Sequence, residues 1–195
     1  MTSAKTTWRT VDVVVAAVLA VAFGVVFWAW GLLWNSVDAV FSFYPPAKAV
    51  LYGVWLIPAV LSVLIIRKPG SGVFTEGLAS TISALLGSFW GMTVIWQGLL
   101  QGVGGEAPFA ASGYRRFSLP VAMAGGALAT FAATLYDSFT WYSNTGWLEF
   151  RIPFIAVGMI SGAIVAGIGS TYLTKALAGT GVLDRFPAGR DRVAV

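Results

Sequence analysis

The first long apolar run of the sequence reads VDVVVAAVLAVAFGVVFWAWGLLW and covers residues 11–34, with Asp12 as its one charged residue. A helix rises about 1.5 Å per residue, so a run of this length crosses the roughly 30 Å hydrocarbon core of a bilayer. The rest of the chain is similar, since 57% of its 195 residues are hydrophobic and 10% are charged. Soluble domains contain about 25% charged residues. The sequence therefore predicts an integral protein of the lipid bilayer.

Five further apolar runs follow the first one, and none of them alternates polar with apolar residues as a half-buried strand would. We predict an all-α integral membrane protein, a six-helix transmembrane bundle that forms a single domain over residues 1–195. The predicted spans cover residues 11–34, 45–66, 73–89, 91–112, 119–136 and 152–176. The polar C-terminal tail, about residues 180–195, is expected to be disordered.

The basic residues predict how these helices are oriented. Ten of the twelve Lys and Arg residues fall near the N-terminus, at 67–68, at 115–116 or towards the C-terminus. Cytoplasmic segments of membrane proteins carry such an excess of positive charge. Both termini are therefore predicted to be cytoplasmic. The same placement explains the net charge of +4 without a nucleic-acid partner.

The absence of two residue types restricts the function. The sequence contains no His and no Cys, so the commonest general base and the commonest soft metal ligands are missing. We expect a protein that is not an enzyme and that has no catalytic residues, no metal site and no cofactor.

A polar interruption, WQGLLQGVGGEAP at residues 96–108, lies inside the fourth predicted span. Gln97 and Gln101 are four residues apart and share one helix face. Gly98 and Gly102 have the same spacing, which allows another backbone to come close. This pattern favours a helix that lines a pocket and whose amides contact a ligand. In the alternative, the two amides hydrogen-bond neighbouring helices and serve packing alone.

Three carboxylates lie within or near the predicted spans, namely Glu76, Glu106 and Asp137. An ionised carboxylate at the centre of a bilayer costs about 2.5–3.5 kcal/mol on insertion scales, so such groups face the bundle interior or a wet cavity. Glu76 is alternatively a carboxylate in the first turn of a helix, and Asp137 an interfacial cap. Two of these carboxylates, the two glutamines and several aromatic residues near the ends of the spans give the candidate substrate-binding set. It consists of Trp34, Trp90, Gln97, Gln101, Glu106, Tyr136, Asp137 and Trp141.

Small residues form a ladder along the first span, at Ala16, Ala20 and Gly24. Such a ladder permits close helix packing. It is either ordinary packing within the bundle or a smooth docking face for another membrane protein, and we consider the docking face as the functional hypothesis.

Several short motifs occur in an order that resembles one transporter family. The motifs are RKPG at 67–70, EGLA at 76–79, LGSFWG at 86–91, GLLQGVGGE at 98–106 and YRR at 114–116. With these motifs in this order, the chain resembles the YkoE-type substrate-binding S component of energy-coupling factor (ECF) transporters, most specifically between residues 67 and 116.

This resemblance implies a six-helix subunit of the bacterial cytoplasmic membrane that binds a vitamin from outside. It also implies a transmembrane T component and two ATPase subunits as partners that drive uptake by ATP hydrolysis. The YkoE type is associated with thiamine and its hydroxymethylpyrimidine precursor. An alanine-xxx-alanine pattern in the first helix of S components is linked to docking on the T component, and Ala16 and Ala20 match it.

Three other functions stay open at this point. The chain is alternatively an S component for a different flat vitamin, since carboxylate, amide and aromatic groups suit several such ligands. It is alternatively a membrane enzyme that acts on lipid, which the lack of His and Cys disfavours. The last alternative is a membrane protein of structural or assembly type that binds no ligand.

Overall fold

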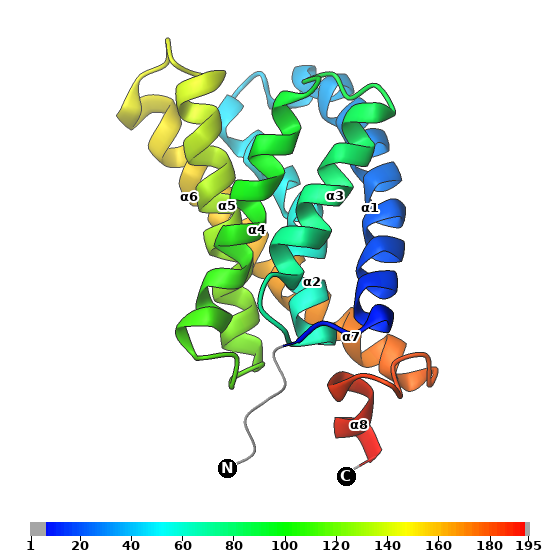
Figure 1. Ribbon diagram of the computed structural model, residues 1–195. Coiled ribbons are helices and arrows are strands. Elements are labelled where there is room, and N and C mark those ends of the chain that lie inside the picture. The colour runs from blue at the N-terminus through cyan, green and yellow to red at the C-terminus, as the bar shows by residue number, and fades with distance from the viewer. Residues whose placement is uncertain (1–6, 194–195) are drawn as a thin grey trace.

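The computed structural model describes residues 7–193, which contain helices and no strand. Figure 1 shows the bundle with its N- and C-terminal ends at the same side. In chain order the elements are α1 (Thr10–Ser36), η1 (Asp38–Phe41), η2 (Pro45–Leu56), α2 (Ile57–Ile66), α3 (Ser71–Leu85), α4 (Thr93–Ala111), α5 (Leu119–Thr140), η3 (Trp147–Arg151), α6 (Ile152–Ser161), η4 (Gly162–Ile168), α7 (Gly169–Gly179) and α8 (Pro187–Val193).

Four stretches are long and apolar enough to cross a membrane. They are α1, residues 45–66, α5 and the continuous helical stretch of residues 147–179. The prediction of an all-α membrane protein is confirmed. Helices also occupy the two remaining predicted spans, but α3 has only 15 residues. Polar residues such as Thr75, Glu76 and Ser80 are buried in α3, so its face towards the interior is unusually polar.

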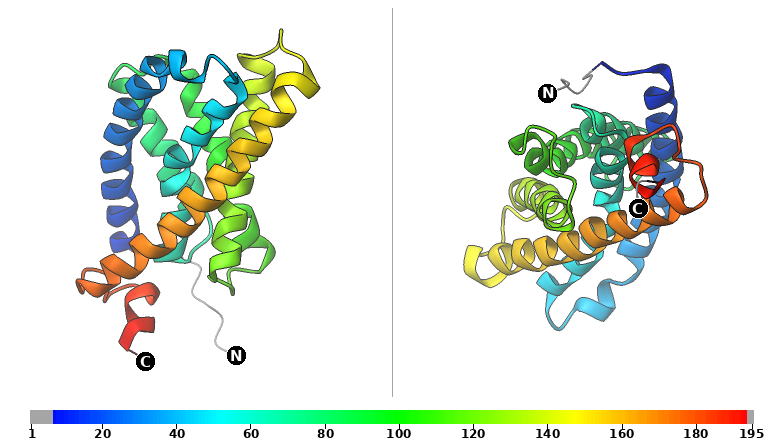
Figure 2. Two further views of the ribbon diagram at one scale, coloured as in Figure 1. Left: turned by 180° about the vertical axis from the view of Figure 1, so that it is seen from behind. Right: turned by 90° about the horizontal axis from the view of Figure 1, so that it is seen from below.

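The helical stretch of residues 45–66, which consists of η2 and α2, is the centre of the bundle. Every residue of α2 from Pro58 to Ile66 is buried, and α3, α4, α5 and α7 all contact it. In the left view of Figure 2, seen from behind, the stretch from α6 to α7 crosses obliquely in front of the other helices.

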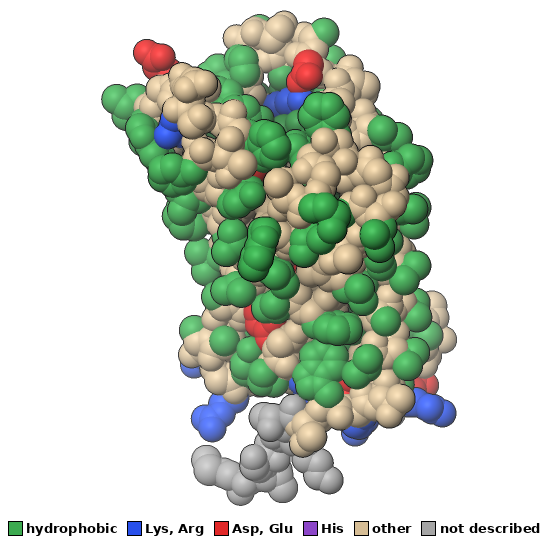
Figure 3. Space-filling model, turned by 45° about the horizontal axis from the view of Figure 1, so that its top comes forward, with side chains coloured by type: hydrophobic (Ala, Val, Ile, Leu, Met, Phe, Trp, Pro, Cys, Tyr) green, Lys and Arg blue, Asp and Glu red, His purple; other side chains and the backbone are tan. Residues whose placement is uncertain are grey.

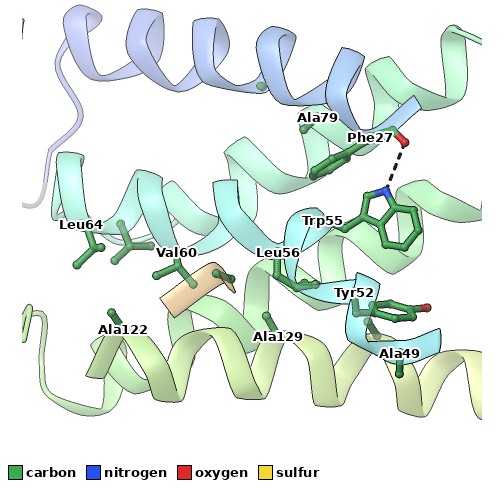
Figure 4. Close-up of a cluster of buried hydrophobic side chains, with 14 of the residues drawn as sticks. Phe27, Ala49, Tyr52, Trp55, Leu56, Val60, Leu64, Ala79, Ala122 and Ala129 are labelled. Carbon is green, nitrogen blue, oxygen red and sulfur yellow. Dashed lines mark hydrogen bonds between the residues drawn. The ribbon is translucent and has the colours of Figure 1, made fainter. Parts of the chain in front are cut away.

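The upper half of this central stretch is the 3₁₀ helix η2, which begins with two prolines. Residues three apart in a 3₁₀ helix lie on the same side, and here Tyr52 and Trp55 both point into the core (Figure 4). Two tryptophan side chains, one on α1 and one on η2, link this segment to α1. Trp30 Nε1 donates to the Leu51 carbonyl at 2.9 Å, and Trp55 Nε1 donates to the Phe27 carbonyl at 3.3 Å.

The small-residue ladder of α1 lies inside the bundle, so the prediction of a docking face is corrected. Ala16 and Ala20 have no exposed surface. A Cβ atom on Gly24 would lie 2.6 Å from Ile82 Cγ2, so this face packs against α3. The small residues allow α1 and α3 to approach within the chain and leave no surface for a partner. The outward face of α1 instead carries exposed valines at positions 13, 14, 18, 21 and 25.

The C-terminal segment also differs from the expectation. Residues 180–185 form turns, α8 follows, and Leu183, Phe186 and Ala188 are buried in a cluster with Ile65 and other apolar residues. Three apolar side chains with a common packing surface are sufficient to order this segment. Residues 194 and 195 of the predicted tail lie outside the described residues.

Candidate functional site

A small cavity lies between η2, α3, α4 and α5, towards the end of the bundle opposite the termini. Its volume is about 40 Å³, which is room for a few water molecules. Its walls combine aromatic rings with amides, hydroxyls and one carboxylate. The lining residues are Phe27, Tyr52, Trp55, Ser80, Ser83, Ser88, Trp90, Val94, Gln97, Gln101 and Asp137.

The polar centre of the cavity is the carboxylate of Asp137, whose residue is 5% exposed. Gln97 Nε2 on α4 donates to Asp137 Oδ1 at 2.9 Å, and the Tyr52 hydroxyl on η2 donates to Asp137 Oδ2. Three elements therefore converge on one buried acid. No Lys or Arg among the described residues forms an ion pair with it. Its hydrogen-bond partners there are two neutral donors, which leaves the carboxyl group able to pair with a cation or a further donor.

An aromatic wall forms one side of the cavity. The rings of Trp55 and Trp90 are 5.7 Å apart and meet edge to face. Trp34 stands behind this wall, with its ring 5.5 Å from Tyr52 and 5.4 Å from Trp55. The Lys48 ammonium lies 4.2 Å over the Trp34 ring and pairs with Asp38, which fixes the second layer. Such a wall suits a flat ring.

The opposite side of the cavity is polar and comes from α3 and α4. Ser80 and Ser83 lie on α3 and face Gln97 and Gln101 on α4. The two helices approach closely here, because a Cβ atom on Gly98 would collide with the Ser80 side chain. The amide and hydroxyl groups therefore meet across a narrow gap and offer both donors and acceptors.

Glu106 lies outside this cavity and caps the beginning of α3. Its Oε2 accepts from the backbone N–H groups of Gly72 at 3.0 Å and Val73 at 3.2 Å, and its Oε1 accepts from Gly70 N–H. The Tyr114 hydroxyl donates to the same Oε1 at 2.7 Å. Burial, and then this bond to Glu106, raises the pKa of Tyr114, so the hydroxyl stays protonated. The free N–H groups of a helix start favour such an acidic partner.

Glu76 has the opposite character, because it is fully buried and neither carboxylate oxygen has a hydrogen-bond partner. Together with Thr75 Oγ1, these are the buried side-chain atoms without a partner among the residues that the structure describes. Glu76 precedes Ser80 by one helical turn, so the two share a face of α3. Glu76 therefore lies on the face of α3 that lines the cavity, one helical turn before Ser80.

Comparison with known proteins decides which family this arrangement belongs to. A family described as "ABC-type cobalt transport system, permease component" matches residues 11–132. A solved structure, "Crystal structure of an S-component of ECF transporter", superimposes with a TM-score of 0.90 at 32% identity, covering 96% of this chain and 94% of the other. The chain belongs to the S components of ECF transporters.

A curated relative of this S component comes from Bacillus subtilis (strain 168). Its printed name is "Putative HMP/thiamine permease protein YkoE", and it is 33% identical over 184 residues. The alignment covers 94% of this chain and 92% of the relative. S components are transporter subunits and are not enzymes, as the sequence led us to expect.

The S component brings together half of the substrate-binding residues predicted from the sequence. Trp90, Gln97, Gln101 and Asp137 line the cavity. The other four do not line it: Trp34 forms the second layer, Glu106 caps α3, and Tyr136 and Trp141 lie elsewhere on and after α5. We did not predict Tyr52 and Trp55 from the sequence. They are three residues apart in a segment that begins with Pro45 and Pro46, and this spacing is the one signal that indicates a shared face of a 3₁₀ helix.

The role of Glu106 gives a first prediction. Glu106→Leu should lower the thermal stability of the purified protein, because it leaves three N–H groups and the Tyr114 hydroxyl without their acceptor, at about 1–3 kcal/mol for each buried group left unpaired. Glu106→Gln keeps an acceptor oxygen and should lose much less. Differential scanning fluorimetry in detergent measures both. Equal stability of the Leu variant and the wild type would contradict the capping role.

Proposed function

We propose that this S component captures thiamine or its hydroxymethylpyrimidine precursor in the cavity around Asp137. The observation that carries the proposal is the convergence of Tyr52, Gln97 and Asp137 beside the aromatic wall. The ligand is then delivered through a T component, with two ATPase subunits hydrolysing ATP to drive uptake. The name of the YkoE relative supports this ligand class.

The chemistry of the cavity suits an aminopyrimidine ring. The exocyclic amino group of such a ring donates hydrogen bonds, and the carboxylate of Asp137 accepts them. The ring nitrogens accept hydrogen bonds, which the amides of Gln97 and Gln101 donate. The indole rings of Trp55 and Trp90 offer apolar faces to a flat heterocycle, and to the thiazolium cation of thiamine.

A metal ion as cargo suits the cavity less well, although the matching family is described by cobalt transport. The lining offers one carboxylate, and the sequence contains no His or Cys. Imidazole and thiolate groups are the ligands that late first-row metals favour. The donor set therefore favours an organic ligand.

Binding requires the cavity to widen, since about 40 Å³ does not hold a pyrimidine ring. Trp90 is the lining residue best placed to move. It stands in the connection between α3 and α4, and Gly87 and Gly91 on either side of it both have positive φ, at 89° and 60°. A Cβ atom on either glycine would meet nothing within 4 Å, so this connection is loosely packed.

The proposal includes a six-span topology in a bacterial cytoplasmic membrane, with both termini cytoplasmic. Helices occupy all six predicted segments. In Figure 3 most Lys and Arg side chains gather at the lower end of the molecule, where Figure 1 places both termini. This distribution follows the positive-inside rule.

Ligand binding is tested by titration calorimetry with thiamine and with hydroxymethylpyrimidine. Gln97→Leu and Asp137→Asn should each weaken binding of the preferred ligand about 5- to 150-fold, because a desolvated polar contact is worth about 1–3 kcal/mol. Trp141→Phe, outside the cavity, is the control and should bind normally. The proposal fails if both cavity variants are folded and bind like the wild type.

The topology is tested separately by cysteine labelling, which is clean because the natural chain has no Cys. Thr180→Cys should react in intact cells only with a membrane-permeant maleimide. Asn144→Cys should also react with an impermeant reagent added outside. Labelling of both positions by the impermeant reagent would rule out the six-span arrangement.

A further inference from the structure

The buried Glu76 side chain forms no hydrogen bond and no ion pair within residues 7–193. It has no exposed surface, and both carboxylate oxygens are without a partner. A buried charge without a partner is strongly destabilising, and a buried neutral acid still loses its hydrogen bonds to water. The fold therefore gains nothing from the polar group of Glu76, which makes it a candidate for contact with a molecule other than the protein itself.

Glu76 lies beside the cavity around Asp137. It is one helical turn before Ser80, which lines the cavity, and the two residues share a face of α3. The helix α4 packs directly on this turn, since a Cβ atom on Gly98 would lie 3.2 Å from the Glu76 carbonyl oxygen. Gln101, three residues after Gly98, also lines the cavity. Glu76 and one wall of the cavity thus belong to the same contact between α3 and α4.

The lining side chains nearest to Glu76 on this wall are not fixed by hydrogen bonds. Neither Ser80 nor Gln101 hydrogen-bonds through its side chain to another residue of the described part of the chain. Gln97, by contrast, is held by Asp137 at 2.9 Å. The cavity must widen from about 40 Å³ to admit a ligand. Rotation of the Ser80 and Gln101 side chains would extend it along α3 to Glu76.

The two acids of this region differ in what they have left to bind. Asp137 already accepts hydrogen bonds from Tyr52 and Gln97, whereas Glu76 has no donor. No Lys or Arg among residues 7–193 forms an ion pair with either acid. A full positive charge gains most from the acid whose own charge is least compensated. A cationic part of a ligand is therefore best placed at Glu76, and a hydrogen-bond donor at Asp137.

We infer that Glu76 binds the positively charged part of the ligand and selects an organic cation over a neutral compound of similar shape. The inference rests on the proposed function, because it places the aminopyrimidine ring at Asp137. The thiazolium ring of thiamine carries a positive charge on a second ring beyond the pyrimidine. Hydroxymethylpyrimidine lacks that ring and is neutral. Glu76 is thus a specificity-determining residue, and of the two ligands it favours thiamine.

The test is titration calorimetry of the full chain in detergent with three ligands. They are thiamine, hydroxymethylpyrimidine and a thiamine analogue in which a neutral thiophene ring replaces the thiazolium ring, so that the shape is kept and the charge is lost. Glu76→Gln should weaken thiamine binding about tenfold or more and change the binding of the two neutral ligands by less than about twofold, because it removes a charge shielded from water. Glu149→Gln removes an exposed carboxylate outside the cavity and is the matched control, which should bind all three ligands normally.

Thermal unfolding distinguishes ligand recognition from a structural role of Glu76. The ligand-free Glu76→Gln protein should be as stable as the wild type or more stable, because the substitution removes a buried carboxylate that has no partner. A small inorganic cation is the other partner that such an acid can take. Replacing sodium by N-methylglucamine at constant ionic strength should leave the thiamine affinity unchanged.

Several results would overturn the inference. They are an equal change, or no change, for thiamine and its thiophene analogue in Glu76→Gln, a loss of stability in that variant, an equal effect of Glu149→Gln, and a thiamine affinity that depends on sodium. Asp137→Asn separates these from failure of the proposed function, since it should weaken all three ligands. If the wild type binds none of the three, or if Asp137→Asn changes nothing, the proposed function itself fails.

Discussion

The buried Asp137 carboxylate accepts two hydrogen bonds, and the rest of the site depends on them. The carboxylate has no ion-pair partner, so Tyr52 and Gln97 must both reach it. This requires η2 to direct Tyr52 inward and α4 to present Gln97 at the same depth. The edge-to-face contacts of Tyr52 with Trp34, Trp55 and Phe154 hold the hydroxyl in this position. The aromatic wall and the polar centre are thus one packed unit.

The buried carboxylates differ in their hydrogen-bond and ion-pair partners, and this difference distinguishes acids with a structural role from acids that can bind a ligand. Asp12 pairs with Arg9 and Lys68 at the end where the termini lie. Glu106 satisfies the start of α3. These two acids are already paired with groups of the protein. Asp137 has only neutral donors and Glu76 has none, so these two acids retain the capacity to bind something else. Both lie on the cavity or one helical turn below it.

Part of the site could be predicted from the positions of polar residues within the predicted spans. Gln97 and Asp137 are polar residues near the same end of antiparallel helices, and the structure brings them into contact. Tyr52 and Trp55 were not predicted, because an apolar stretch after two prolines reads equally well as α-helix or 3₁₀ helix. Their inward direction follows from the 3₁₀ geometry, and hydrogen bonds of Trp30 and of Trp55 itself hold this segment against α1.

Three errors had a common cause, which is that a sequence does not show what faces a residue. The ladder of Ala16, Ala20 and Gly24 allows any helix to approach, and the helix that does so is α3 of the same chain. Glu76 was the acid considered for the first turn of its own helix, but the acid that caps the start of α3 is Glu106, which comes from α4. The C-terminal helix was missed because its ordering depends on a few apolar side chains that pack on distant residues such as Ile65.

The central claim is that the ligand lies between the aromatic wall and Asp137. An experimental structure of the protein with bound hydroxymethylpyrimidine or thiamine tests it most directly. The account predicts density for the pyrimidine ring against Trp55 or Trp90, with a hydrogen bond to Gln97 or Asp137 and with Trp90 displaced to enlarge the cavity. Ligand density at any other place, with the Tyr52–Asp137–Gln97 contacts and the small cavity unchanged, would contradict it.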